Sequence, residues 1–230
     1  MSLLTNLKKY GYVIIKNAIK NPNKKLIKLK NNKSIHSKLL WDIRFETKKY
    51  FSKIWKTDKL VCSFDGYIYN TNNKLDWHVD QNMSHSKGLI CIQGVLSLTK
   101  SNATQILVKS HKYFNSFGKR LTSYNPNEWE FYTIPKNDNI WNLNLKIHTP
   151  ILHPGDLLLF DSRLIHCVNN SEPRTAIYIS MVPRSFVSKR IQKKRKIGFK
   201  KGYQTTHWCT RYIIVDKNTN PPKININELV

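Results

Sequence analysis

The chain has 230 residues, of which 40% are hydrophobic and 23% charged, and a formal net charge of +25. This length fits one medium domain with a sizeable core. The absence of an apolar run of about eighteen residues or of a signal-peptide core predicts an intracellular protein, cytoplasmic or nuclear, without a membrane span. Its four cysteines are widely spaced without a CxxC pair, which argues against a disulfide scaffold or a zinc site built on them.

The first sixty residues predict helical support. A short apolar stretch, Tyr12–Ile15, is followed by a segment rich in Lys and Asn. Residues 39–55 then carry apolar side chains at steps of three and four, which is typical of an amphipathic helix. The recurring positions are Leu39, Leu40, Ile43, Tyr50, Phe51 and Ile54.

From about Leu60 the pattern changes to short strands. Segments rich in Val, Ile, Tyr and Phe alternate with polar turns, which predicts an antiparallel sandwich or barrel. The strand-like segments span residues 61–70, 74–81, 88–99, 104–110, 155–163 and 174–184.

The first chemical signal is the segment KLDWHVDQ at 74–81. In a strand, side chains two residues apart share a face, so His78 and Asp80 would bring an imidazole and a carboxylate to one point. From neighbouring strands, Gln93 and Tyr67 could hydrogen-bond a small ligand, or could equally be polar residues of the core or rim.

Residues 114–148 have no clear periodicity and read as a long insertion or lid. Three tryptophans, Trp77, Trp141 and Trp208, could line a substrate pocket, although aromatic residues more often fill cores.

A third ligand is supplied by HPGDLLLFDSRLIHCVNN at 153–170. Pro154 and Gly155 predict a turn, residues 157–160 a buried strand, and His166 the distal ligand. His153 precedes the turn and fits that role less well. Two histidines and one carboxylate form the facial triad that leaves positions open on iron(II).

Arg174 follows eight residues later and opens the strand RTAIYISMV, which we expect to run antiparallel beside the strand of His166. A fixed guanidinium can hold a carboxylate through a bidentate ion pair, here the distal carboxylate of 2-oxoglutarate. His111 could support the fold near the site. The remaining histidines are expected to be ordinary loop or surface residues: His36, His85, His148, His153 and His207.

These motifs resemble the phytanoyl-CoA dioxygenase family of iron(II)/2-oxoglutarate oxygenases. The resemblance covers residues 67–181 and implies a double-stranded β-helix, a mainly β, cupin-like jelly roll with flanking helices. It implies Fe(II) on His78, Asp80 and His166, 2-oxoglutarate on Arg174, and O2 as the second co-substrate. Where the family often has Pro-Gly before Ser-His, this chain has Val108 and Lys109, so the local turn could differ.

The charge has two explanations. Lys outnumbers Arg by 31 to 8 and Asn occurs 24 times, which AT-rich coding would produce. The dense cluster Lys189–Lys201 could instead bind nucleic acid, provide a nuclear address or form a solvated face. We divide the chain into an oxygenase domain, residues 1–188 with N-terminal helical support, and a basic C-terminal extension of the same domain, residues 189–230.

The leading hypothesis is a dioxygenase, most simply a hydroxylase, that couples C–H oxidation to the decarboxylation of 2-oxoglutarate to succinate. A second hypothesis is a basic nucleic-acid-binding protein on a jelly-roll scaffold, and a third is an oxygenase acting on nucleic acid or on a polyanionic protein. A cupin-like isomerase or sugar-binding protein gives Arg174 no role. The substrate and the oligomeric state stay open.

Overall fold

The computed structural model describes residues 2–32, 34–82, 88–118, 132–169, 172–217, 220–223 and 228–230. They form two facing antiparallel sheets with helices on the outside, as predicted. His85 lies outside the described residues. Within them, no helix combines the length and the apolar character that crossing a membrane requires.

The larger sheet has six strands. Its order is β1 (Tyr12–Ile15), β9 (Leu157–Asp161), β5 (Ile92–Ser97), β11 (Arg174–Pro183) and β2 (Leu60–Cys62), with β3 (Tyr67–Thr71) also paired to β11. The smaller sheet has five strands: β7 (Tyr132–Thr133), β4 (Lys74–Val79), β10 (His166–Asn169), β6 (Thr104–Leu107) and β8 (Ile147–His148). A separate pair joins β12 (Gln204–Thr205) to β13 (Ile214–Asp216).

The larger sheet alternates between two environments. On β11, Ile177 and Ile179 pack in a core shared with the helices, whereas Ala176 and Tyr178 belong to the cluster between the sheets. The period of two along a strand produces this division. Odd positions of β11 therefore face the helices, and even positions face the interior of the barrel.

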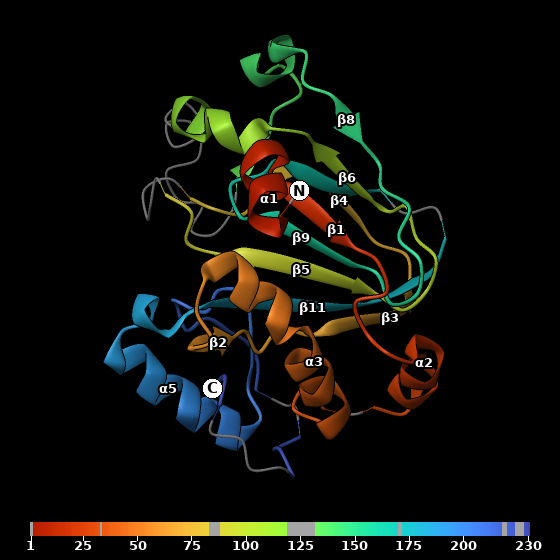
Figure 1. Ribbon diagram of the computed structural model, residues 1–230, viewed down its shortest axis with the longest axis vertical. Helices are drawn as coiled ribbons and strands as arrows, with labels where there is room; N and C mark the ends of the chain where they lie inside the picture. Colours follow the sequence, from red (N-terminus) through yellow and green to blue (C-terminus); the bar gives the residue numbers. More distant parts are fainter. Residues whose placement is uncertain are drawn as a thin grey trace.

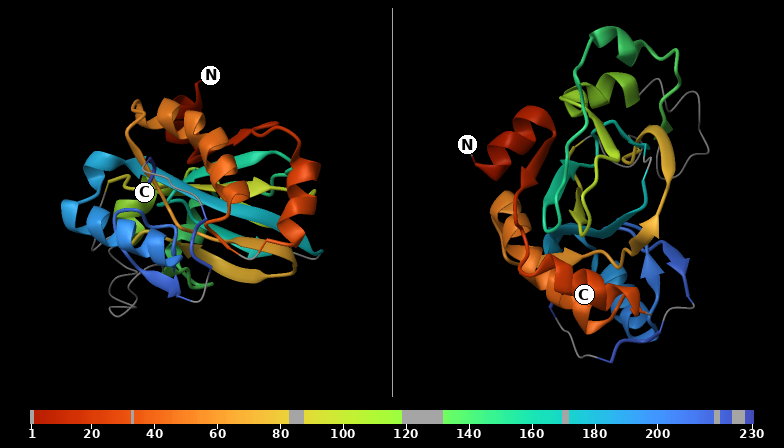
Figure 2. Two further views of the ribbon diagram at one scale, coloured as in Figure 1. Left: turned by 90° about the horizontal axis from the view of Figure 1, so that it is seen from below. Right: turned by 90° about the vertical axis from the view of Figure 1, so that its right-hand side faces the viewer.

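Helices cover the outer side of the larger sheet (Figures 1 and 2). They are α1 (Leu3–Tyr10), α2 (Pro22–Lys30) and α3 (Lys38–Trp55), with α5 (Lys189–Lys201) further along the chain. The predicted helix at 39–55 is confirmed as α3, whose Ser37 side chain caps the N-terminus by accepting from the Leu40 amide. Its buried face includes Leu40, Ile43 and Phe51, as the periodicity predicts.

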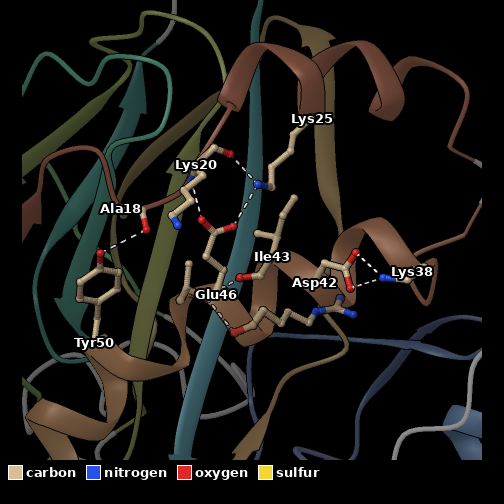
Figure 3. A network of polar contacts seen from close by, with 10 residues as sticks. Ala18, Lys20, Lys25, Lys38, Asp42, Ile43, Glu46 and Tyr50 are labelled. Carbon is tan, nitrogen blue, oxygen red and sulfur yellow. Dashed lines mark hydrogen bonds and ion pairs between the residues drawn. The ribbon is translucent and has the colours of Figure 1, made fainter.

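Polar contacts fix α3 to the connection between β1 and α2 (Figure 3). The carboxylate of Glu46 on α3 forms an ion pair with Lys25 Nζ at 3.0 Å and also accepts from the Lys20 amide. The Tyr50 hydroxyl donates to the Ala18 carbonyl at 3.1 Å. These contacts hold α3 in a defined position relative to α2 and to the chain that follows β1.

The described part of the predicted lid supplies the two edge strands of the smaller sheet and part of an apolar cluster packed against that sheet. Strand β7 pairs with β4 and strand β8 with β6, while residues 119–131 lie outside the described set. Tyr132, Ile140 and Phe117 share an apolar cluster with Val79, next to His78. The 132–148 segment thus supports the strand that carries the HxD motif.

The turn before Ser110 forms without the glycine that the resemblance suggests. Lys109 takes that place with φ of 71°, in the left-handed region where glycine is the usual residue. His111 follows it, and its Nε2 donates to the Lys8 carbonyl at 3.1 Å, so this histidine ties α1 to the barrel.

Candidate metal centre and co-substrate site

His78, Asp80 and His166 are brought together by the smaller sheet. Strands β4 and β10 pair so that His78 lies directly opposite His166, with ring centroids 4.3 Å apart. Asp80 directly follows β4, and its carboxylate oxygens lie 3.7 Å from His78 Nε2 and 3.5 Å from His166 Nε2. The three ligand atoms lie within 4.8 Å of one another, and all three residues are buried.

Hydrogen bonds set the tautomer of both imidazoles. Nδ1 of His78 contacts the Asp76 carbonyl at 2.7 Å, and Nδ1 of His166 contacts the Leu164 carbonyl at 3.0 Å. A carbonyl oxygen only accepts, so each Nδ1 carries the proton and each Nε2 presents a lone pair toward Asp80. This is the arrangement that metal-binding histidines use.

The charge states also suit a divalent cation. Burial, followed by the neighbouring imidazole of His78, lowers the pKa of His166 to about 4, so this ring is neutral at pH 7. Burial opposes ionisation of Asp80, but the nearby imidazoles, His166 above all, and the Gln93 amide lower its pKa to about 2. Neutral imidazole and ionised carboxylate are the forms that bind metal.

The Asp80 segment is held in place by neighbouring side chains. Gln93 on β5 donates its amide N–H to Asp80 Oδ2 at 2.6 Å. One residue further on, the side-chain oxygen Oε1 of Gln81 accepts from the Ser162 hydroxyl at 2.7 Å. This bond joins the segment to the turn between β9 and β10. Gln93 therefore lies at the site, as predicted. The hydrogen bond described for it there is to Asp80, whereas the sequence predicted one to a small ligand.

Arg174 enters from the facing sheet. The structure corrects the expectation that its strand pairs with the strand of His166: β10 pairs with β4 and β6, whereas β11 lies in the larger sheet. The chain therefore passes from the smaller to the larger sheet between Asn169 and Arg174. Arg174 therefore lines the same cavity as the triad from across the barrel.

Among the residues that the structure describes, the guanidinium of Arg174 has no counter-ion. The side chain is 3% exposed, and within the described residues it makes no hydrogen bond or ion pair. Burial lowers the pKa of Arg174, but a guanidinium stays protonated at neutral pH. A buried cation without an anionic partner is costly, and an anionic ligand would satisfy it.

The cavity between the sheets has a volume of about 220 Å³. Besides the triad and Arg174, its walls include Val95, Thr104, Phe160, Val168 and Tyr178. It thus has an apolar body, a cationic end and a cluster of potential metal ligands, which is the composition expected for a small-molecule site.

Tyr67 lies elsewhere. Tyr67 pairs with Ile177, whose side chain faces the helices. The Tyr67 hydroxyl donates to the Asn32 carbonyl at 2.8 Å. The interior tyrosine is Tyr178, which the period of two along β11 from Arg174 could have identified. None of the three tryptophans lines the cavity: Trp77 and Trp141 pack together, and Trp208 is in a buried cluster.

Two further residues of the cavity wall were not predicted, Asp65 and His207. His207 comes from the C-terminal segment, which therefore contributes to the site. His36 was also expected at the surface, but it is fully buried among aromatic rings. The sequence around His207 contains no local signal for this position. His207 comes to the cavity wall through the way in which α5 and the chain after it pack on the domain.

The chain is similar in sequence to one characterised fungal protein. Ava biosynthesis cluster protein O of Aspergillus versicolor is 30% identical over 201 residues, which is 77% of this chain and 65% of the relative. This chain thus spans less than two thirds of that relative's length. No family model matches the chain.

Solved structures establish the fold. HygX of Streptomyces hygroscopicus, with nickel, 2-oxoglutarate and hygromycin B bound, matches with a TM-score of 0.57 at 10% identity, over 81% of this chain and 88% of HygX. The epimerase SnoN, in complex with Fe3+, alpha-ketoglutarate and nogalamycin RO, gives 0.55 at 12%, over 78% and 82%. EctD of S. alaskensis, with 2-oxoglutarate and 5-hydroxyectoine, gives 0.51 at 13%, over 79% and 75%.

Proposed function

We propose that this chain is an iron(II)- and 2-oxoglutarate-dependent oxygenase of the phytanoyl-CoA dioxygenase type, which hydroxylates a small organic substrate. The observation that carries the proposal is one cavity in which two Nε2 lone pairs and a carboxylate converge opposite a buried guanidinium that has no partner among the described residues. Three similarly folded proteins have 2-oxoglutarate or alpha-ketoglutarate bound, two of them with a metal as well, which supports the same co-substrate here.

Each residue then has a distinct task. His78, Asp80 and His166 would hold the metal on one side and leave adjacent positions open. Iron(II) in such a site, together with 2-oxoglutarate and dioxygen, supplies an oxidant that removes hydrogen from a C–H bond while 2-oxoglutarate becomes succinate and carbon dioxide. Arg174 would bind the far carboxylate, Gln93 would keep Asp80 oriented, and Val95 and Phe160 would exclude water.

Anaerobic addition of Fe(II) and then 2-oxoglutarate to the full chain tests the proposal directly. We expect the weak visible charge-transfer band of a keto acid chelated to ferrous iron, which requires the metal, the co-substrate and their geometry together. If no band forms at saturating 2-oxoglutarate, the proposal is wrong.

The same titration examines Arg174. Removing the cation by Arg174→Ala should raise the 2-oxoglutarate concentration that gives half of the maximal band intensity by at least about ten-fold, because a buried charge-assisted pair is lost. Binding of Fe(II) should be retained. Arg190→Ala, at an exposed position of α5, is the matched control and should titrate like the wild type. An unchanged requirement in Arg174→Ala would remove Arg174 from this role.

A second hypothesis concerns the basic cluster, which forms α5. Arg195 is buried against Phe64, whereas the other seven cations of this helix are exposed, and the helix has no acidic residue. Such a surface attracts phosphates. Binding of a labelled oligonucleotide should weaken steeply between 50 and 200 mM salt, by about ten-fold or more, and disappear when the exposed lysines are changed to glutamine. Salt-independent or absent binding would leave α5 as a solvated face.

A further inference from the structure

One carboxylate in the cavity has no task in the proposed metal site. Asp65 lies in the turn between β2 and β3 and lines the same cavity as Asp80 and Arg174. Its Oδ1 accepts from the Gly66 amide at 2.8 Å. Within the part of the chain that the structure describes, its side chain makes no other hydrogen bond and no ion pair.

A buried cation near Asp65, Arg44, is directed at the main chain. Arg44 on α3 is fully buried, and its two terminal nitrogens donate to the carbonyl oxygens of Ile35 and Asp65, each at 2.9 Å. The guanidinium thus bonds to the backbone oxygen of Asp65 and not to its carboxylate. Arg174, the single Lys or Arg among the described residues that line the cavity, is reserved for 2-oxoglutarate in the proposed function.

The electrostatics of Asp65 agree with an uncompensated charge. Burial raises the pKa of Asp65 to about 7, with a smaller upward contribution from the Asp80 carboxylate, and the Gly66 amide and Arg44 offset this only in part. A carboxylate that gains a cationic partner would return toward its ordinary pKa. The cavity therefore favours a ligand that brings a positive charge to this point.

The remaining charges of the loaded site would balance without Asp65. A divalent metal and Arg174 together match Asp80 and the two carboxylates of 2-oxoglutarate. Asp65, when ionised, then contributes one negative charge in excess, although the protein as a whole has a net charge of +25. An anionic substrate group would meet this carboxylate at close range, whereas a cationic one would neutralise it.

We propose that Asp65 binds a cationic nitrogen of the substrate, so that the molecule oxidised here is a small amine or guanidine. This inference rests on the proposed function and specifies its substrate class. It excludes phosphate esters and other anionic groups from the space beside Asp65.

The test uses the full chain with Fe(II) and 2-oxoglutarate under anaerobic conditions. Small primary amines and guanidines, from butylamine to phenethylamine and butylguanidine, are titrated beside the alcohols and carboxylates of the same skeletons. Perturbation of the visible band reports binding next to the metal. We expect amines or guanidines to bind at least about ten-fold more tightly than their neutral and anionic counterparts.

Asp65→Asn should remove this preference while keeping the band itself. The amide can still accept from Gly66, so the turn is retained and only the charge is lost. Asp58→Asn is the matched control, since it makes the same charge change at an exposed position. A structural role limited to the turn would leave ligand preference unchanged in Asp65→Asn.

The two proposals fail in different ways. Absence of the band in the wild type would overturn the proposed function. A normal band with no preference for cationic probes, or with a preference that persists in Asp65→Asn, would overturn the role of Asp65 and leave the oxygenase assignment intact.

Discussion

Replacing His78, Asp80 or His166 by alanine is expected to reduce succinate formation from 2-oxoglutarate by at least about 100-fold, because each change leaves two ligands where iron needs three. The loss should be accompanied by loss of bound iron, measured on the purified protein after Fe(II) loading. Both readouts follow from the convergence of the three ligand atoms within 4.8 Å.

The control for this experiment is His153, the other histidine near the PGD turn. It is exposed and does not line the cavity. His153→Ala should therefore retain iron and succinate formation at the wild-type level. A protein that lost activity with His153→Ala but kept it with His166→Ala would show that the distal ligand had been assigned to the wrong histidine.

The candidate metal ligands could be identified from sequence because their spacing is largely local. His78 and Asp80 are two residues apart, and His166 follows a strand and turn that the PGD motif indicates. The position of Arg174 was also predictable, although the pairing of its strand was not. Sequence proximity suggested a hairpin with β10, whereas a jelly roll sends consecutive strands to opposite sheets.

The other residues of the site depend on contacts that are distant in sequence. Tyr67 was chosen because it lies on a strand near the HxD motif, but its register against Ile177 turns it toward the helices. Asp65 and His207 reach the cavity through a turn and through the C-terminal segment. Neither position shows the periodicity or spacing that would identify it, so only the packed structure reveals them.

Asp65→Asn is also expected to stabilise the protein, and the gain should depend on pH. The pKa of Asp65 is about 7 in the folded state and near 3.9 in an unfolded chain. Between these values the folded state keeps a proton that the unfolded state releases, so stability falls as the pH rises. The cost should reach roughly 3–4 kcal/mol above pH 7 and vanish near pH 4.

Urea unfolding of the metal-free protein at pH 4, 5.5, 7 and 8 measures this difference. The free energy of unfolding of Asp65→Asn should exceed that of the wild type increasingly from pH 4 to pH 8, while Asp58→Asn should follow the wild type at every pH. A difference that grows toward acid would mean that Asp65 already has a cationic partner in the folded chain, and a constant difference would mean that folding leaves its pKa unchanged. A charge retained at a cost in stability is expected where a ligand later compensates it. The pH dependence therefore bears on the amine site without any substrate being known.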